Sequence, residues 1–318
     1  MITATTFDGK FQKAQIGAKD VKRLINSHKL VWINCASLSH GELKSVFEGV
    51  ESIPHFLVDY CTRRQRPRID QHGDTVFLVF DMLSYEHSLR NEQLNAIVGG
   101  NFVLTITGKN LRQIDRIEEL AGTNSAHIRK LGKAYLLYLI LDSIVDDYGL
   151  ILDKIDEDME RLEASLLEGS KENMHHKIIQ MGKIMAKIWR SIMPEKEIFH
   201  SLGRSEFNML GGHAAVYFRD TASDLLTISE RIEMQRETIS NLMEVYASSI
   251  SNSLSTIMKM LTVLTAVLLV PTLISGIYGM NLAYLPIANH PNGFLVMIII
   301  MIISMLLLLL AFRLKKWI

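Results

Sequence analysis

The residues best placed to do chemistry lie near the carboxyl end of this 318-residue chain, around a stretch that carries no charge. Between Met260 and Phe312 there is no Asp, Glu, Lys or Arg. Steps of three and four residues trace a mostly small or hydroxyl-bearing stripe: Ser255, Met258, Thr262, Thr265, Leu269, Thr272, Gly276 and Gly279. Residues with this spacing share one helical face. Such a face either packs closely against another helix or lines a wet path.

Two apolar runs must position this stripe, Met260–Tyr278 and Phe294–Phe312. Each is long enough to cross a hydrocarbon core of about 30 Å at about 1.5 Å per helical residue. The outer loop 279–293 joins them, and its part Leu282–Gly293 has no basic residue. The tail 313–318 has three: Arg313, Lys315 and Lys316. The positive-inside rule therefore predicts a multi-pass protein of the plasma (inner) membrane with both termini in the cytoplasm.

Composition argues against several other classes of protein. Lys and Arg together number 34, as do Asp and Glu, so no global field favours nucleic acid as a partner. Cys35 and Cys61 are too few for a disulfide framework and fit a reducing compartment. The first ten residues are polar and do not resemble a signal peptide. There is no glycine-rich phosphate loop, nucleophile elbow, HExxH or CxxC spacing, so we expect no enzyme.

The segment 1–124 has the pattern of an α/β domain. Apolar, β-branched or aromatic runs predict strands at Leu30–Cys35, Thr75–Met82, Leu94–Val98 and Phe102–Thr107. Gly99-Gly100-Asn101 predicts a hairpin turn, and Ser39–Phe47 a helix with a serine cap. A basic patch comprises Arg63, Arg64, Arg66 and Arg68. Because no aromatic residues are interleaved with it, the patch favours a solvated face over a nucleic-acid site.

Helical patterns dominate from Ser125, and we expect acidic antiparallel helices over 125–210. Asp142–Glu172 contains eleven acidic residues against three basic ones. A solvated helix face is the ordinary interpretation of such a run, and a docking surface for cations is the functional alternative. Gly169-Ser170 indicates a helix break, and Pro194 a kink or second break.

A single long helix is predicted from Gly211-Gly212 onward, with a stalk over 211–259 that continues into the membrane segment 260–278. No Gly or Pro interrupts the chain between His213 and Val270. Apolar residues at heptad spacing follow the stalk: Leu225, Ile228, Ile232, Ile239, Leu242 and Tyr246. A heptad seam of this kind favours self-association.

The tetrapeptide Tyr278-Gly279-Met280-Asn281 ends the first membrane segment, and a second membrane segment (294–312) and the basic tail follow it. This arrangement resembles the CorA family of divalent-cation channels, whose mark is Gly-Met-Asn at that place. Further segments resemble the family: Val145-Asp146-Asp147-Tyr148, Tyr217-Phe218-Arg219-Asp220, Met243-Glu244-Val245-Tyr246, Met258-Lys259, Pro271 and Lys315-Lys316-Trp317. The resemblance covers essentially the whole chain, weakly before Arg66 and strongly after Asp142.

The resemblance implies a funnel-shaped homopentamer with an α/β cytoplasmic domain, a long helical stalk and two transmembrane helices, the first of which lines the pore. It also implies transport of Mg²⁺, with Co²⁺ or Ni²⁺ admitted by some members. Mg²⁺ gives up its waters reluctantly, so a filter for the hydrated ion needs neutral oxygen acceptors in a ring. Asn281 and the backbone at Gly279 can supply them, whereas Met280 is expected to pack against neighbouring helices.

Several pore positions can then be given roles. Thr262, Thr265, Thr272 and Gly276 suit a hydrated path, although such residues can also serve helix packing alone. Met258 and Leu269 are candidates for apolar constrictions. Glu244 would form an acidic ring at the mouth of the stalk. Ser255 replaces the commoner family Asn, which predicts a wider or less selective inner filter, and the outer turn Leu282–Gly293 lacks the acidic residue of many members.

The family resemblance also implies regulation by cytoplasmic Mg²⁺ bound between neighbouring subunits. Asp220 matches one ligand of the regulatory ion, and Glu86 is the looser match for the partner from the adjacent subunit. Without the ion, facing carboxylates would repel each other and destabilise the closed state. Two alternatives stay open: a Zn²⁺ or Co²⁺ transporter on the same scaffold, and a membrane-anchored soluble enzyme or sensor. Lipid and divalent cations are the expected partners, without nucleic acid.

Overall fold

A computed structural model describes residues 1–7, 11–27, 29–48, 50, 52–86, 88–168, 173–207, 210, 212–280, 285–287 and 290–317. The chain divides into two compact units, Met1–Leu242 and Met243–Ile318. One helix, α8 (Ala215–Tyr278), belongs to both units. At about 1.5 Å per residue its 64 residues extend over about 95 Å.

The first unit is built on a seven-stranded sheet with the order β2-β1-β3-β7-β6-β5-β4. The strands are β1 (Ile2–Thr6), β2 (Gln12–Gln15), β3 (Val31–Ala36), β4 (Arg68–His72), β5 (Thr75–Tyr85), β6 (Leu89–Val98) and β7 (Phe102–Thr107). Neighbours are antiparallel except β3 and β7, which pair in parallel with Ile33 opposite Leu104. The sheet is therefore mixed, with its one parallel pair at the centre.

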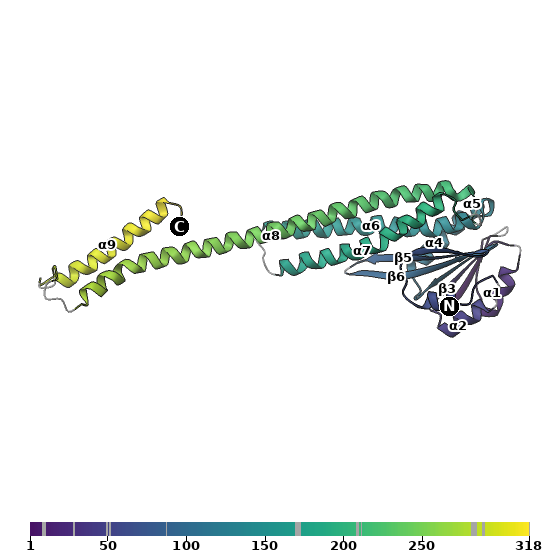
Figure 1. Ribbon diagram of the computed structural model, residues 1–318, viewed down its shortest axis with the longest axis horizontal. Helices are drawn as coiled ribbons and strands as arrows, with labels where there is room; N and C mark the ends of the chain where they lie inside the picture. Colours follow the sequence, from purple (N-terminus) through teal and green to yellow (C-terminus); the bar gives the residue numbers. More distant parts are fainter. Residues whose placement is uncertain are drawn as a thin grey trace. The chain divides into compact units, whose positions relative to one another are not determined.

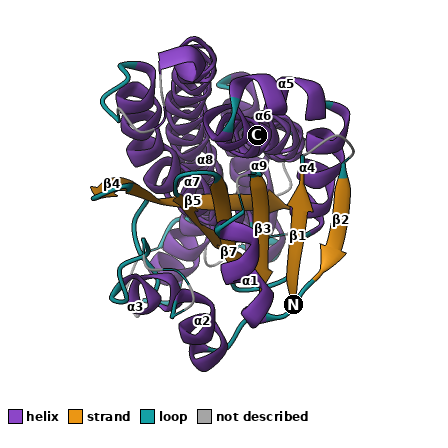
Figure 2. Ribbon diagram, turned by 90° about the vertical axis from the view of Figure 1, so that its right-hand side faces the viewer, coloured by secondary structure: helices purple, strands orange, loops and turns teal. Residues whose placement is uncertain are grey.

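Helices cover both faces of this sheet (Figure 2). The short helices α1 (Ala18–Ile25), α2 (His40–Phe47) and α3 (Leu57–Thr62) lie on one face, and α4 (Arg112–Thr123), α5 (Ser125–Leu131), α6 (Lys133–Leu167) and α7 (Met174–Gly203) on the other. Side chains of β5 alternate between the two cores. Leu78 and Phe80 are buried against the long helices, while Phe77 and Val79 are buried on the α1–α3 side. The result is a three-layer α/β/α unit.

The first part of α8, after the short turn η2 (Gly212–Ala214), runs beside α6 and α7 (Figure 1). Arg231 of α8 forms ion pairs with Asp153 and Asp156 of α6, each at 2.8 Å. Arg236 of α8 lies over the ring of Trp189 on α7, with 5.6 Å between guanidinium carbon and ring centroid. These contacts make the beginning of α8 part of the first unit.

The heptad seam of the stalk has a different role from the predicted one. Leu225, Ile228 and Ile232 are buried in the same core as the inward faces of α6 and α7. Their apolar spacing is accounted for by packing within one chain, so this part of the seam gives no support for self-association.

The second unit contains the remainder of α8 and α9 (Gly293–Leu314). Both helices are long and apolar enough to span a membrane, as the two uncharged runs predicted. The helix α8 passes through Pro271 without a break. At the end of α9 the ring of Phe312 stacks on Trp317, with 5.7 Å between centroids.

Most of the elements predicted from the sequence are confirmed. The four predicted strands correspond to β3, β5, β6 and β7, and Ser39 caps α2, accepting a hydrogen bond from the Glu42 amide. Of the two alternatives predicted at Pro194, the break is wrong, because α7 continues through it to Gly203, and the kink stays a prediction. Strands β1, β2 and β4 were missed. The predicted break at Gly169-Ser170 lies outside the described residues, as does Gly211, where the long helix was predicted to open; the described α8 begins at Ala215.

Candidate functional site

The stripe traced in the sequence lies on α8, and its side chains are exposed along the described helix. Met258 and Leu269 retain 60% and 62% of their accessible surface, which is high for large apolar side chains. Gly276 has open space where a Cβ would stand. Because large apolar and small polar residues are exposed together, this face of α8 is not completed by its own chain.

The threonines of the stripe share one hydrogen-bonding arrangement. The hydroxyls of Thr262, Thr265 and Thr272 each donate to the backbone carbonyl four residues earlier, at 2.8, 2.8 and 2.7 Å. This bond uses the hydroxyl hydrogen and leaves the oxygen lone pairs as acceptors. A hydrated cation directs water hydrogens outward, so a row of acceptors suits its passage.

The opposite face of α8 is closed. Val263 and Val267 are 6% and 7% exposed, although the residues beside them in the sequence are exposed or half-buried. Val267 is two residues from Thr265, which places the two side chains about 200° apart around the helix. The helix thus has one buried apolar face and one exposed, partly polar face.

At the end of the stripe, α8 finishes at Tyr278, and the next two residues continue as a turn. The amide of Gly279 donates to Ser275 O at 2.9 Å, and that of Met280 to Ile277 O at 3.2 Å. A Cβ on Gly279 would lie 3.2 Å from Ser275 O, so a larger residue would be tight there. Met280 is 54% exposed, and Asn281 lies outside the described residues.

The carboxyl end of α8 and the amino end of α9 enclose a pocket of ≈ 550 Å³ lined by Ser275, Tyr278, Gly279, Ile287, Gly293, Phe294, Met297, Ile298 and Met301. The hydroxyl of Tyr278 donates to Pro286 O at 2.9 Å, which ties the end of α8 to the loop. The other predicted pore positions, Glu244 and Ser255, are exposed on α8. Hydrogen bonds thus fix the backbone at the end of α8 and in the Gly279-Met280 turn.

Asp220, a predicted regulatory ligand, belongs to a group of carboxylates on α6 and α8. Burial, followed by the charges of Asp220 and Asp142, raises the pKa of Asp224. Burial and then the charge of Asp142 raise the pKa of Asp146. Asp142 also accepts a hydrogen bond from Thr221 at 2.6 Å. These four aspartates repel one another when ionised, so a cation beside them would be stabilised.

Sequence reasoning singled out Asp220 alone from this group. The signal for Asp142 and Asp146 was present in the acidic run, but an ordinary solvated face explained that run equally well. Among the described residues, no group of three or more His, Cys, Asp or Glu converges well enough to hold a metal ion. The aspartates of a single chain therefore attract a cation without forming a complete set of ligands.

Glu86, the second predicted regulatory residue, is exposed just after the end of β5. It lines a pocket of ≈ 670 Å³ together with Arg90, Arg112 and Lys154. In the described part of one chain no hydrogen bond or ion pair joins Glu86 to Asp220. The cations that line the same pocket compete for the Glu86 carboxylate.

Comparisons with known proteins agree on one family. The family described as "CorA-like Mg2+ transporter protein" matches residues 27–316. The chain is 31% identical to the cobalt/magnesium transport protein CorA of Thermotoga maritima, over 90% of this chain and 83% of that protein. It is 27% identical to the protein of the same name from Methanocaldococcus jannaschii, over 92% of each. The complete structure of the M. jannaschii CorA magnesium transporter superposes with a TM-score of 0.86, covering 100% of this chain and 99% of that one at 25% identity.

Proposed function

We propose that this chain, which belongs to the family of CorA-like Mg²⁺ transporters, carries hydrated divalent cations, Mg²⁺ foremost, along the exposed stripe of α8. The observation that carries the proposal is the threonine row, whose hydroxyl hydrogens are used within the helix and whose oxygens remain as acceptors. The relatives named cobalt/magnesium transport proteins support Co²⁺ as a second cargo. Family membership also sets aside the membrane-anchored enzyme, since the family is one of transporters.

The absence of charged residues from the proposed path bears on its selectivity for the hydrated ion. The stretch from Met260 to Phe312 has no charged residue, so no carboxylate is available to strip water from the ion. Mg²⁺ keeps several of its waters when bound, and neutral oxygens recognise that shell without displacing it. We assign this recognition to the filter Gly279-Met280-Asn281, with Asn281 accepting from first-shell water.

A path of this kind requires several copies of α8. One chain leaves Thr265, Leu269 and Thr272 exposed on a single face, and a ring of identical faces would enclose a central channel. We propose a homopentamer, with Met258 and Leu269 as apolar constrictions and Glu244 as an acidic ring nearer the α/β unit. Because Leu225, Ile228 and Ile232 of the heptad seam pack within each chain, assembly is expected to rest on the exposed faces of the second unit and on contacts between α/β units.

The distribution of Lys and Arg around the two apolar helices sets the expected orientation in the membrane. Arg313 lies in the last turn of α9 and Lys315 and Lys316 follow the helix, whereas the loop between the helices has no Lys or Arg. The positive-inside rule therefore places both termini, and with them the α/β unit, in the cytoplasm. In the plasma membrane this orientation makes uptake of Mg²⁺ the proposed direction of transport.

Regulation by cytoplasmic Mg²⁺ is supported by the coupled aspartates on α6 and α8. An ion bridging Asp220 to Glu86 of a neighbouring subunit would screen their repulsion and hold the assembly closed. Substituting Asp220→Asn should weaken the protection from proteolysis that Mg²⁺ confers on the purified protein. Protection that is unchanged by the substitution would remove Asp220 from the regulatory site.

The experiment that tests the proposed function is cation flux into liposomes containing the purified protein. We expect Mg²⁺ uptake that Co²⁺ competes with, and at least about a tenfold loss in Asn281→Ala, equivalent to removing one good charge-assisted contact. Unaltered flux in that variant would contradict the filter assignment. A Zn²⁺ flux that exceeds the Mg²⁺ flux would favour the alternative of a zinc transporter on the same scaffold.

A further inference from the structure

A groove of ≈ 1030 Å³ on the α/β unit lies outside the cation pathway and is lined by positive charge. One wall is the segment 64–67 before β4, and the other is the middle of α7. Four basic residues line it: Arg64, Arg66, Lys187 and Arg190. Asp81 of β5 is the single acidic residue in the lining.

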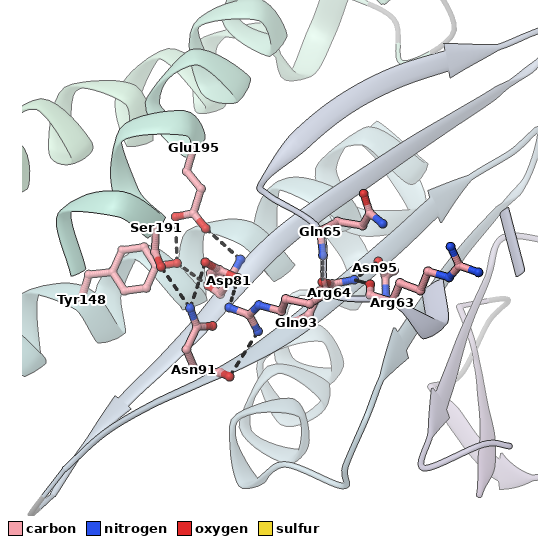
Figure 3. A network of polar contacts seen from close by, with 10 residues as sticks. All are labelled: Arg63, Arg64, Gln65, Asp81, Asn91, Gln93, Asn95, Tyr148, Ser191 and Glu195. Carbon is pink, nitrogen blue, oxygen red and sulfur yellow. Dashed lines mark hydrogen bonds and ion pairs between the residues drawn. The ribbon is translucent and has the colours of Figure 1, made fainter. Parts of the chain in front are cut away.

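Asp81 is fully engaged at the floor of the groove (Figure 3). It is 3% exposed, and its two carboxylate oxygens accept from Arg64 and from the Asn91 amide, each at 2.9 Å. Arg64 also donates to the Asn91 carbonyl at 3.2 Å. Since Arg64 neutralises Asp81, the charges of Arg66, Lys187 and Arg190 remain in excess.

These three cations lack acidic partners within the part of the chain that the structure describes. Arg66 and Lys187 form no hydrogen bond or ion pair there. Arg190 donates only to the Ala186 carbonyl of its own helix, at 3.1 Å. The concave, partly apolar walls concentrate the field of like charges that repel one another, and an anion in the groove would relieve that repulsion.

The basic patch noted in the sequence is thus divided by the fold. Arg68 pairs with Asp70 at 3.1 Å and lies over the Tyr60 ring, so it has a structural role. The Arg63 carbonyl accepts from Gln93 at 3.2 Å, while its side chain extends away from the other residues drawn in Figure 3. Arg64 and Arg66 line the groove and meet the basic face of α7. Only the latter pair contributes to a concave site.

The hydrogen bonds of Asn91 hold this wall of the groove in place. The Asn91 amide nitrogen donates to Asp81 and to Ser191, the latter at 3.0 Å, which fixes the orientation of the amide because an ionised carboxylate only accepts. Its oxygen, Oδ1, is then buried without a donor. This oxygen is closed off from the groove, so the recognition of a ligand rests on the cations of the lining.

We propose that the groove binds a phosphorylated anion with more than one negative charge, such as the phosphate chain of a nucleotide. Guanidinium groups match phosphate oxygens bidentately, and the lysine adds a mobile point charge. The volume suits a ligand of nucleotide size. A phosphorylated lipid head group shares this chemistry, so the experiment must separate the two sources.

The test uses the full-length protein in detergent, in Mg²⁺-free buffer because polyphosphates chelate Mg²⁺. ATP, tripolyphosphate and dihexanoyl phosphatidic acid, a soluble lipid analogue, are titrated while tryptophan fluorescence is followed. Trp189 lines the groove and is 36% exposed, so ligand binding should change its emission, and Trp189→Phe identifies that signal. We expect saturable binding of ATP or tripolyphosphate if the source is soluble, and of the lipid analogue if it is the membrane.

The decisive variant is Arg66→Gln with Lys187→Gln, which removes two cations that hold no partner and so leaves folding intact. We expect at least about a tenfold rise in Kd, the loss of roughly one charge-assisted contact. The matched control is Lys177→Gln with Lys183→Gln, which removes the same charge from exposed positions of α7 outside the groove and should change Kd by less than about twofold. Equal weakening in both double variants, or no saturable binding of any of the three ligands, would overturn the proposal. So would a change in assembly mass in the groove variant without phosphate binding, since the groove would then be a contact between copies.

Discussion

The centre of the sheet and the stripe of α8 use the threonine hydroxyl differently. Thr105, in the centre of the sheet, is fully buried, and its hydroxyl accepts from Trp32 at 2.9 Å and donates to Asn34 at 3.2 Å. Thr265 of α8 is exposed, and its hydroxyl bonds only within its own helix. Thr105 therefore uses its hydroxyl as both donor and acceptor within one chain, whereas the threonines of the α8 stripe leave acceptor positions that one chain does not use. The proposed function accounts for this difference, since the stripe would then face other copies and a solute.

Glu195 of α7 is a second buried polar group of the α/β unit whose hydrogen-bond partners lie in the same chain. The side chain is completely buried, with one oxygen accepting from the Asp81 amide at 2.8 Å and the other 2.8 Å from the Tyr148 hydroxyl. That hydroxyl also donates to the Asp81 carbonyl, and it has only one hydrogen. Both contacts are satisfied if Glu195 is protonated and donates to Tyr148. Burial, aided by the charge of Asp81, raises the pKa of Glu195, in agreement with a neutral acid.

The largest effect is expected from removing an aromatic side chain from the core of the α/β unit. Phe80 is fully buried and packs edge to face on Phe199, with 5.8 Å between centroids. Phe80→Ala should lower the free energy of unfolding of this unit by about 3–5 kcal/mol. Leu269→Ala on the stripe should leave that free energy unchanged and raise basal cation flux instead. Denaturation followed by the fluorescence of buried Trp32 gives the first quantity, and equal destabilisation by both changes would break the contrast between the units.

A smaller loss is expected when Glu195 is shortened. Glu195→Ala leaves the Asp81 amide without its acceptor in a buried site, which costs about 1–3 kcal/mol before any cavity is considered. Glu195→Gln should preserve stability, because the amide oxygen can accept from Asp81 and the amide nitrogen can donate to Tyr148. Comparable destabilisation by Ala and Gln would show that Glu195 is ionised rather than neutral.

The same proton makes stability depend on pH. A folded-state pKa above that of the unfolded chain means that the folded state binds the extra proton. Its stabilising contribution is complete below the unfolded value and declines as pH rises through the folded value, by at most about 1.4 kcal/mol per pH unit. Between pH 5 and 8 the wild-type protein should lose stability relative to Glu195→Gln. Parallel pH profiles for the two proteins would contradict the neutral acid.

The sequence predicted most of the α/β unit because its signals are local. Strands β3, β5 and β7 are buried on both faces of the sheet. A strand of this kind appears in the sequence as a continuous apolar run without alternation, which is easy to recognise. The edge strand β2, Gln-Lys-Ala-Gln, is wholly exposed and carries no comparable signal. A break was predicted at Pro194 because proline removes one helical hydrogen bond. The helix α7 nevertheless continues, because Ile188, Ile192 and Ile198 on either side of the proline are packed in the core.

The candidate site was predictable in part for a related reason. Spacing alone placed Thr265, Leu269 and Thr272 on one face, because a helix fixes which residues align. The coupling of Asp142 and Asp146 to Asp220 and Asp224 joins positions that are far apart in the sequence, and only the packing of α6 against α8 reveals it. The groove between Arg66 and Lys187 could not be predicted either, because these two residues are far apart in the sequence and only the fold brings them together.

The smallest effect on stability is expected at the stripe itself. Thr265→Val and Thr272→Val remove hydroxyls that bond only to their own helix, so unfolding should change by less than about 0.5 kcal/mol. Transport should respond more strongly, with a several-fold lower Mg²⁺ flux because acceptors for water are lost. A matched Val263→Thr change on the buried face should leave the flux unaffected if the protein folds. Flux measured in liposomes checks each variant.

The central claim, that one face of α8 lines a wet path, is tested most directly by thiol accessibility. The native Cys35 and Cys61 give little background, since burial raises the pKa of both thiols, that of Cys35 to about 12. Cysteine is introduced singly at Thr265 and at Val267, two residues apart on opposite faces, and liposomes are treated with a charged, water-soluble thiol reagent. The account predicts that Thr265→Cys is modified and its Mg²⁺ flux blocked, while Val267→Cys is unmodified. Modification of Val267→Cys alone, or of both positions at equal rates, would contradict it.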